Sequence, residues 1–202
     1  MSHVLDLKKE LRQKGYKVRA CQRDKDKLSG KICERFIGQP EYQRAKVVMW
    51  YLHCRSEVRT SSVVEAALQD EKTLVVPYCT KDEDGNNKLG LWRLESFEEL
   101  VPGTWDILEP PRNRWAELNK EIGPSALDMV LVPGVAFDRD GGRLGNGAGY
   151  YDRLMSQVRA DTLLVAASYE SQLFPRIPMV PYDVFMDKVI TEKAVYTGRG
   201  RV

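Results

Sequence analysis

The segment 142–153 reads Gly-Arg-Leu-Gly-Asn-Gly-Ala-Gly-Tyr-Tyr-Asp-Arg, with a glycine at every second position from Gly145 to Gly149. Glycine lacks a Cβ, so such a backbone can take positive φ angles and let an anion approach its N–H groups. A helix expected from Tyr150 would add the positive end of its dipole. The pattern predicts a phosphate-binding loop, with Asp152 as a candidate ligand of a Mg²⁺ ion on those phosphates.

An ordinary turn explains the same residues without any ligand. Glycines form turns, and an acid such as Asp152 in a first helical turn complements the helix dipole. The segment is neither of the common nucleotide fingerprints, because no Gly-Lys-Ser/Thr follows and the spacing is G-x-G-x-G rather than G-x-G-x-x-G. On these residues alone, both interpretations remain open.

A second candidate anion site lies near the start of the chain. Residues 4–17 place Val4, Leu7 and Leu11 at helical spacing, and Lys8 and Arg12 lie four residues apart. Two cations on one helix face could reach the same anion, although a solvated basic stripe is the commoner reason for such a pattern.

The chain of 202 residues is long enough for one well-buried domain, and we expect a single domain over 1–202. Its 31 basic and 29 acidic residues leave a net charge of +2. A net charge this small gives no overall electrostatic attraction to nucleic acid or to an anionic membrane. Small-molecule partners are therefore favoured.

The first twenty residues are rich in Lys and Arg, which does not resemble an export signal. No apolar stretch approaches the roughly 20 residues of a membrane helix. The four cysteines have no C-x-x-C spacing and only two histidines occur, which disfavours a zinc site. A cytoplasmic protein with reduced thiols is expected.

Alternating strand and helix signals position these candidates. The hydrophobic patterns predict helices over 4–17, 24–37, 63–69 and 150–159, and strands over 45–52, 73–77, 88–94, 127–133, 163–168 and 187–191. Ser62 and Glu65 form a capping-box pattern for the third helix. Residues 101–124, with four prolines, are predicted to be a long ordered loop.

Strands that alternate with helices predict an α/β fold with a mostly parallel sheet covered on both faces. Ligands of such sheets bind beyond the carboxyl ends of the strands. Glu57 follows one predicted strand, the glycine loop follows another, and Asp187 opens the last. We therefore expect these groups to approach one another.

Other motifs surround the glycine loop in a recognisable order. They are Lys8-Lys9-Glu10-Leu11-Arg12, Glu57 with Thr60, Trp105 with Glu109-Pro110, residues 131–138 (Leu-Val-Pro-Gly-Val-Ala-Phe-Asp), and Asp187 with Val189 and Ile190. Together with residues 142–153 they resemble the 5-formyltetrahydrofolate cyclo-ligase family, also called methenyltetrahydrofolate synthetases. The resemblance covers nearly the whole chain.

The resemblance implies a three-layer α/β/α domain of the sugar-isomerase and coenzyme A transferase type. It also implies an enzyme that converts 5-formyltetrahydrofolate and ATP to 5,10-methenyltetrahydrofolate, ADP and phosphate, with Mg²⁺ as cofactor. The formyl oxygen would be phosphorylated first, and no protein nucleophile would be required, since positioning and charge neutralisation carry phosphoryl transfer.

The resemblance also implies a role for each matching residue. Arg143 and Tyr151 are the predicted catalytic residues. The predicted ATP site comprises Lys8, Lys9, Glu10, Leu11, Arg12, Arg143, Leu144, Gly145, Asn146, Gly147, Ala148, Gly149, Tyr150 and Tyr151. The predicted folate site comprises Arg12, Leu52, Glu57, Trp105 and Tyr151, and the predicted metal ligands are Asp152 and Asp187.

Asn146 and Ala148 depart from relatives that carry basic side chains in the glycine loop, so phosphate contacts there would come from the backbone. The residues leave two other functions open: a folate- or nucleotide-binding protein without catalysis, and an interaction protein that uses the basic N-terminal segment on nucleic acid. The cyclo-ligase is the leading hypothesis, and a monomer is expected.

Overall fold

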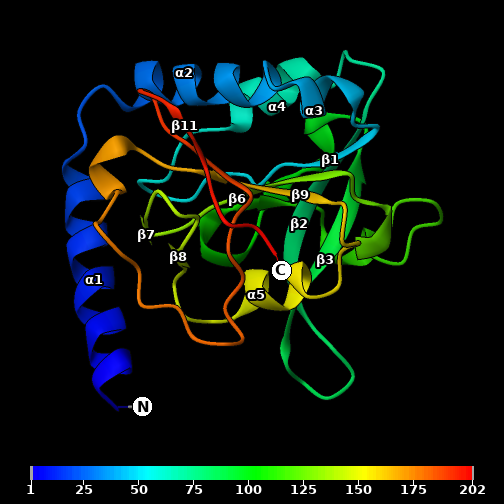
Figure 1. The fold of residues 1–202 in the computed structure, drawn as a ribbon. Helices are drawn as coiled ribbons and strands as arrows, with labels where there is room; N and C mark the ends of the chain where they lie inside the picture. The colour runs from blue at the N-terminus through cyan, green and yellow to red at the C-terminus, as the bar shows by residue number, and fades with distance from the viewer. Residues whose placement is uncertain (1, 202) are drawn as a thin grey trace.

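The computed structural model describes residues 2–201, which form a central sheet of seven strands (Figure 1). The strands are β1 (Val47–Met49), β2 (Thr73–Lys81), β3 (Asn87–Leu94), β6 (Met129–Val132), β9 (Leu163–Ala167), β10 (Lys188–Ile190) and β11 (Val195–Thr197). Their order across the sheet is β11-β10-β9-β6-β1-β2-β3. The five inner strands are mutually parallel, and each edge strand is antiparallel to its neighbour. The predicted mostly parallel sheet is confirmed.

The described part of the chain has five α-helices around the sheet: α1 (Ser2–Cys21), α2 (Lys25–Ile37), α3 (Pro40–Arg44), α4 (Ser61–Ala67) and α5 (Tyr150–Met155). In Figure 1, α2, α3 and α4 lie over one face, α5 lies under the other, and α1 runs along one side. This arrangement has the three layers expected from the sequence.

Two hydrophobic cores separate the layers, because successive side chains of a strand point to opposite faces. In β6, Met129 and Leu131 belong to the core beneath α2 and α4, whereas Val130 and Val132 belong to the core that contacts α5. Strands buried on both faces must be apolar at every position. The continuous apolar runs in the sequence have this cause.

Several element boundaries differ from the sequence prediction. Helix α1 continues to Cys21, four residues beyond the predicted end. Helix α4 begins at Ser61 after Thr60, so the capping box predicted from Ser62 was wrong. Helix α3 and strand β11 were not predicted, because five- and three-residue elements carry too few residues for a periodic pattern.

Short elements organise the remaining segments. They are β4 (Val101–Pro102), β5 (Leu108–Glu109), β7 (Ala136–Phe137), β8 (Arg143–Leu144) and the 3₁₀ turns η1 (Phe97–Glu99), η2 (Thr104–Asp106), η3 (Arg112–Arg114), η4 (Pro124–Ala126) and η5 (Glu170–Gln172). The predicted loop 101–124 is thus ordered, with β4 paired to β5.

Helix α1 lies against β7 through a glycine. A Cβ on Gly15 would stand 2.5 Å from the Val135 carbonyl oxygen, so only glycine allows this approach. Glycine in a helix interior costs about 1 kcal/mol relative to alanine. The close approach explains why that cost is tolerated, and it brings the basic face of α1 to the glycine loop.

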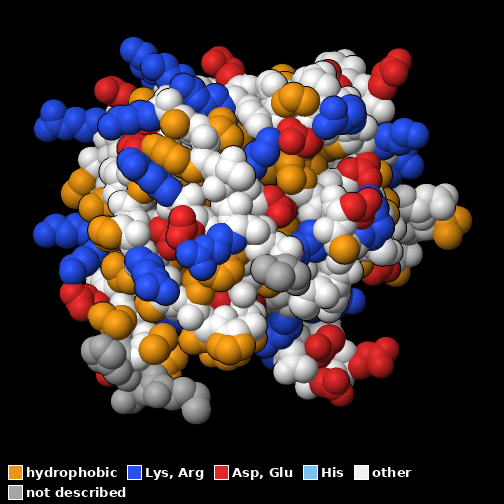
Figure 2. Space-filling model, in the orientation of Figure 1, with side chains coloured by type: hydrophobic (Ala, Val, Ile, Leu, Met, Phe, Trp, Pro, Cys, Tyr) orange, Lys and Arg blue, Asp and Glu red, His pale blue; other side chains and the backbone are white. Residues whose placement is uncertain are grey.

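Figure 2 shows basic side chains spread over one face of the molecule, with acidic side chains between them. Acidic side chains gather at the tip of the β2–β3 hairpin, where Asp82, Glu83 and Asp84 follow β2. Among the described residues, no helix is long and apolar enough to cross a membrane.

Candidate functional site

A cavity of about 380 Å³ opens beyond the carboxyl ends of β1 and β6. Tyr51 and Leu52 line it from the segment that follows β1, and Pro133 and Gly134 from the segment that follows β6. The glycine loop 145–149 and the 101–124 segment complete the wall. The cavity lies where ligands of parallel sheets usually bind, and its volume suits small-molecule ligands.

The glycine loop presents free amides. Gly147 and Gly149 have φ angles of +97° and +74°, which side chains rarely adopt. No backbone carbonyl within residues 2–201 accepts a hydrogen bond from the N–H groups of residues 146–149. Residues 146–148 are exposed, so their N–H groups are open to solvent, and a run of unpaired N–H groups along a cavity can bind an anion.

Three side chains donate hydrogen bonds to backbone carbonyls of this loop. Arg12 Nε donates to the Gly145 carbonyl at 2.9 Å, and Asn87 Nδ2 and Arg153 Nη1 donate to the Ala148 carbonyl at 3.2 and 3.3 Å. With these carbonyls occupied, the amides are left for a ligand. Helix α5 is only six residues long, so its dipole contributes less than the predicted helix 150–159 would.

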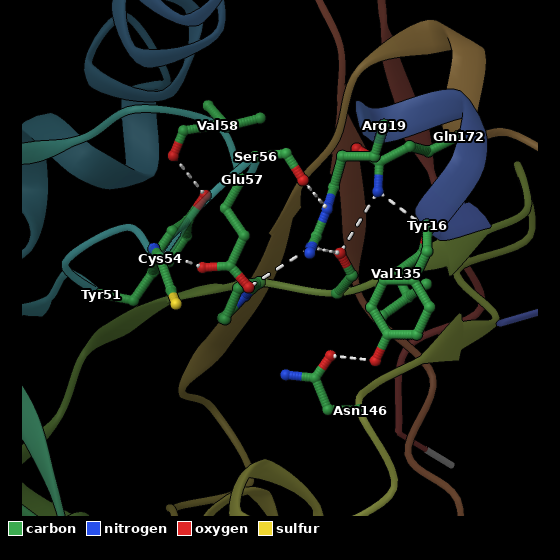
Figure 3. Close-up of polar contacts among 12 residues, drawn as sticks. Tyr16, Arg19, Tyr51, Cys54, Ser56, Glu57, Val58, Val135, Asn146 and Gln172 are labelled. Carbon is green, nitrogen blue, oxygen red and sulfur yellow. Dashed lines mark hydrogen bonds and ion pairs between the residues drawn. The ribbon is translucent and has the colours of Figure 1, made fainter. Parts of the chain in front are cut away.

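Helix α1 closes one side of the cavity. Besides the Arg12 contact, Tyr16 Oη donates to Asn146 Oδ1 at 2.8 Å (Figure 3). Asn146 thus uses its side chain to bind α1. The predicted absence of a side-chain phosphate contact at this position is consistent with that geometry.

Arg143 and Asp152 meet at the base of the glycine loop. Arg143 is buried, and it donates through Nη2 to Asp152 Oδ1 at 2.8 Å and through Nη1 to the Pro133 carbonyl at 3.1 Å. Its Nε is buried with no hydrogen-bond partner in the structure. The Asp152 side chain is 39% exposed and lines the cavity. A buried cation and an accessible carboxylate therefore lie together beside the free amides.

Aromatic and aliphatic side chains form the apolar part of the cavity. Leu52, Trp105 and Tyr151, all predicted to contact folate, line it. The Trp105 ring is 55% exposed and meets Tyr150 edge to face at 6.4 Å. The Arg143 guanidinium lies 5.8 Å from the centre of the Tyr151 ring. These rings offer faces to a planar heterocycle.

Glu57 is the buried carboxylate of the cavity, 9% exposed. Its Oε2 accepts the Cys54 N–H at 3.0 Å and its Oε1 lies 3.4 Å from Arg19 Nη1 (Figure 3). Burial raises the pKa of Glu57, and the charge of Arg19 opposes that rise. A carboxylate in this setting favours a ligand that donates hydrogen bonds.

Six residues of the predicted ATP site do not line the cavity: Lys8, Lys9, Glu10, Leu11, Arg12 and Leu144. Arg12, also predicted to contact folate, donates to the Gly145 carbonyl instead. Lys8 is buried in an ion pair with Asp183, and Lys9 and Glu10 are exposed. Leu11 packs against the small core of Ala136, Leu144 and Ile177. Their assignment to ATP stays a prediction.

Asp187 also lies apart from the cavity lining. It precedes β10, and its Oδ2 accepts the N–H of Leu164 at 2.7 Å, at the amino end of β9. This position is at the opposite strand end from the segments that line the cavity. The expected meeting of Asp187 with Glu57 and the glycine loop is not found, so Asp187 as a metal ligand stays a prediction.

The sequence analysis missed Arg19 and gave no role to Glu109, two buried charged residues of the cavity wall. Glu109 Oε1 accepts the Thr104 N–H at 3.1 Å. A signal for Arg19 existed, because Lys8, Arg12, Gly15 and Arg19 follow a 4-3-4 spacing on one helix face. Ending the predicted helix at residue 17 concealed it.

Comparison with known proteins agrees with this geometry. The model of the 5-formyltetrahydrofolate cyclo-ligase family matches residues 4–192. The mouse 5-formyltetrahydrofolate cyclo-ligase is 29% identical over 193 residues, covering 92% of each chain. The NMR structure of Aquifex aeolicus 5,10-methenyltetrahydrofolate synthetase superposes with a TM-score of 0.79 at 35% identity, over 97% of this chain and 95% of that one.

A second solved structure shares the fold. The Mycoplasma pneumoniae 5,10-methenyltetrahydrofolate synthetase superposes with a TM-score of 0.69 at 22% identity, over 92% of this chain and 98% of that one. The motifs and the matches over nearly the full length lead to one conclusion: the chain belongs to the 5-formyltetrahydrofolate cyclo-ligase family, a family of ligases.

Proposed function

We propose that the cavity binds ATP and 5-formyltetrahydrofolate together and converts them to 5,10-methenyltetrahydrofolate, ADP and phosphate. The observation that carries this proposal is the juxtaposition of unpaired loop amides with the Arg143–Asp152 pair in one cavity. A folate binder without catalysis would have no use for a phosphate cradle. Membership of the family supports the same reaction.

The chemistry proceeds in two transfers. The formyl oxygen attacks the γ-phosphorus, the bond to the β-phosphate oxygen breaks, and ADP leaves with that electron pair. N10 of the folate then attacks the formyl carbon, the carbon–oxygen bond breaks and phosphate departs, while N10 loses its proton to solvent. Phosphorylation turns the formyl oxygen into a leaving group, and no protein nucleophile takes part.

The protein's contribution is position and charge. The amides of residues 146–149 would hold the phosphates, with Arg12 fixing the loop from behind. Arg143, buried beside the loop, would stabilise charge that develops on the transferring phosphoryl group. Buried donors already in place need no reorganisation when the reaction occurs.

Asp152 fits a magnesium ion bound mainly through ATP. Within residues 2–201, no cluster of three or more Asp, Glu, His or Cys residues could form a complete metal site. Magnesium is commonly held by one or two carboxylates plus phosphate oxygens, and Asp152 supplies a half-exposed carboxylate next to the amides. The ion would neutralise phosphate charge, with Asp152 fixing its place.

Glu57 would accept hydrogen bonds from the amino-pyrimidine edge of the pterin, while Leu52, Trp105 and Tyr151 contact its faces. This assignment pairs the buried acceptor with the part of the folate that is richest in donors. The Tyr151 ring lines the cavity 5.8 Å from the Arg143 guanidinium, so it would contact the folate beside the group that faces the phosphates.

The test is product formation from purified protein, 5-formyltetrahydrofolate, ATP and Mg²⁺, followed by the near-ultraviolet absorbance of the methenyl product and by phosphate release. We expect one phosphate per product and a requirement for all three additions. Asp152→Ala should abolish both signals, whereas Asp161→Ala, a change at an exposed aspartate, should not. Tight folate binding without turnover would instead favour a sequestering protein.

A further inference from the structure

The contacts of Arg19 suggest a role that the reaction alone does not assign. Its side chain is only 6% exposed, although it comes from the last turn of α1. The guanidinium donates through Nε to Ser56 Oγ at 3.1 Å and through Nη1 to the Gly134 carbonyl at 3.0 Å and Glu57 Oε1 at 3.4 Å (Figure 3). Arg19 thus links α1 and the segment after β6 to the loop that carries Glu57.

The partners of Arg19 are themselves fixed. Gln172 Nε2 donates to the Gly134 and Val135 carbonyls at 3.3 and 2.8 Å. On the other side, Tyr169 Oη donates to the Glu57 carbonyl at 3.2 Å. These hydrogen bonds fix the backbone of the residues that Arg19 contacts. Both ends of the Arg19–Glu57 pair are therefore held by a second layer of contacts.

The pair leaves one carboxylate oxygen available. Glu57 Oε2 is engaged by the Cys54 N–H at 3.0 Å, whereas the Oε1 contact with Arg19 is long at 3.4 Å. For comparison, the Arg143–Asp152 contact is 2.8 Å. A loosely held oxygen with two lone pairs can still accept a hydrogen bond from a ligand.

We propose that Arg19 is a positioning residue for folate binding. Arg19 holds Glu57 ionised and aims its carboxylate at the donors of the pterin edge. The inference rests on the proposed function, because it takes Glu57 to be the pterin acceptor. It adds that the folate affinity of this site depends on a residue of α1 that acts through Glu57.

The charges around Glu57 support this role. Burial raises the pKa of Glu57, and Arg19 counteracts the rise. The other titratable groups facing Glu57 are Cys54 in its own loop, Tyr51 after β1 and Tyr151 of α5, and burial raises the pKa of each. These groups are uncharged near neutral pH. Within residues 2–201, Arg19 is therefore the charged partner that lowers the pKa of Glu57 against the effect of burial.

An arginine suits this position better than a lysine. Its planar fork reaches Ser56, Gly134 and Glu57 at once, whereas an ammonium is a single point charge. Substitutions can therefore separate the contribution of the Arg19 charge from that of its forked geometry. Arg19→Lys keeps a charge but loses the fork, and Arg19→Met loses both.

The test is titration calorimetry of 5-formyltetrahydrofolate and, separately, of ATP with Mg²⁺, from about pH 6 to pH 8.5, on wild-type protein, Arg19→Lys, Arg19→Met, Glu57→Gln and the Arg19→Met/Glu57→Gln double variant. For Arg19→Met we expect folate affinity at least about tenfold weaker, on the scale of losing one hydrogen bond to a charged group. The loss should grow as the pH falls, because Glu57 without its partner takes up a proton.

Arg19→Lys should bind folate more weakly than wild type but with the wild-type pH dependence. The double variant should bind as weakly as Glu57→Gln alone, because Arg19 acts through Glu57. ATP affinity should be unchanged in every variant. A general packing role would instead weaken both ligands together, with no dependence on pH.

Wild-type folate affinity in Arg19→Met, or additive losses in the double variant, would overturn the inference. If Arg19→Met does not fold, the pH dependence of Arg19→Lys decides: a loss that grows on acidification would contradict the charge role assigned to it. Failure of the wild-type protein to bind 5-formyltetrahydrofolate would instead refute the proposed function, so the two failures are distinguishable.

Discussion

Arg143 and Asp152 form an ion pair, with Nη2 2.8 Å from Oδ1, at the point where the glycine loop enters α5. The sequence predicted separate roles for them, a cation for the phosphates and a ligand for magnesium. Their contact means that each helps to fix the position of the other. A ligand that engages one residue must therefore change the environment of both.

We expect Asp152→Asn to lower the rate of product formation by at least about 100-fold, on the scale of losing one preorganised electrostatic group from an active site. The amide keeps the shape of the side chain but not the charge for a cation, so the Mg²⁺ dependence of ATP binding should also disappear. Steady-state kinetics and ATP titrations across Mg²⁺ concentrations measure both effects.

Asp161→Asn is the matched control, because Asp161 also pairs with an arginine, Arg159, at 2.9 Å but is 76% exposed. Its kinetics should equal those of the wild type, since exposed pairs contribute little. Unchanged Mg²⁺ dependence in Asp152→Asn would show that another residue positions the metal, and Asp187→Asn would then be the next variant.

Gly147→Ala should weaken ATP binding by about tenfold while folate binding is retained, because alanine disfavours a φ of +97° by about 1–2 kcal/mol. A rearranged loop would no longer present its amides in one direction. Packing is not the cause, since the nearest side-chain atom to an added Cβ, from Arg12, would be at 3.7 Å.

The β2–β3 turn supplies a control with the same backbone problem. Gly85 has a φ of +80° and nothing within 4 Å of an added Cβ. Gly85→Ala should lose similar stability in thermal unfolding without any change in ATP affinity. Equal ATP affinities for the two variants would show that the glycine loop does not hold the phosphates.

The sequence predicted the layers and the inner strands well, because doubly buried strands must be apolar throughout and their hydrophobic runs are unambiguous. It also placed the glycine loop, Glu57, Leu52 and Trp105 at one cavity. It did not predict the α1 contacts. Lys8 pairs with Asp183, 175 residues away, and no local pattern encodes such a partner.

The edge of the sheet was equally unpredictable. Strand β11 has only three residues, too few for a periodic pattern. It pairs with β10 because the chain turns back on itself after β10. The metal-ligand role of Asp187 rested on the family resemblance and stays a prediction. Its Oδ2 accepts the Leu164 N–H from the neighbouring strand, a contact that no local pattern encodes.

Lys8→Met should lower the free energy of unfolding by about 3–5 kcal/mol, the usual cost of leaving one partner of a buried pair uncompensated. The Lys8 and Asp183 side chains are only 7% and 12% exposed. Adding Asp183→Asn should restore part of the loss, as measured by urea unfolding. Additive losses in the double variant would mean that the two residues do not depend on each other.

The stable double variant also tests the ATP assignment of Lys8. Its ATP affinity should match the wild type if Lys8 serves only to fix α1 through Asp183. A weakened ATP affinity in a protein of restored stability would support the phosphate contact predicted from the sequence.

Glu99 anchors the segment that brings Trp105 and Glu109 to the cavity. It accepts hydrogen bonds from Arg114 Nη2 at 3.2 Å and from Lys120 Nζ, and from the N–H groups of Glu95 and Ser96 at 3.1 and 3.4 Å. Burial opposes ionisation, but the Lys120 hydrogen bond and the backbone donors prevail and lower the pKa of Glu99 from 4.5 to about 2.

A carboxyl group with a lowered pKa in the folded state stabilises the fold above its unfolded pKa, and that contribution is lost as the pH falls toward the folded value. Glu99 should therefore contribute fully above pH 4.5 and progressively less down to about pH 2. Glu99→Gln should be less stable than wild type near neutrality, and the difference should narrow on acidification. Urea unfolding at a series of pH values measures this.

Glu98→Gln is the control from the same turn, because Glu98 is exposed while Glu99 is not. Its stability should follow the wild-type curve at every pH. Curves for Glu99→Gln and wild type that stay parallel from neutral to acidic pH would show that Glu99 ionisation is not linked to folding. Stability curves that converge on acidification would confirm this link. A weaker folate affinity of Glu99→Gln near neutrality would show that Glu99, with Arg114 and Lys120, also supports the cavity wall.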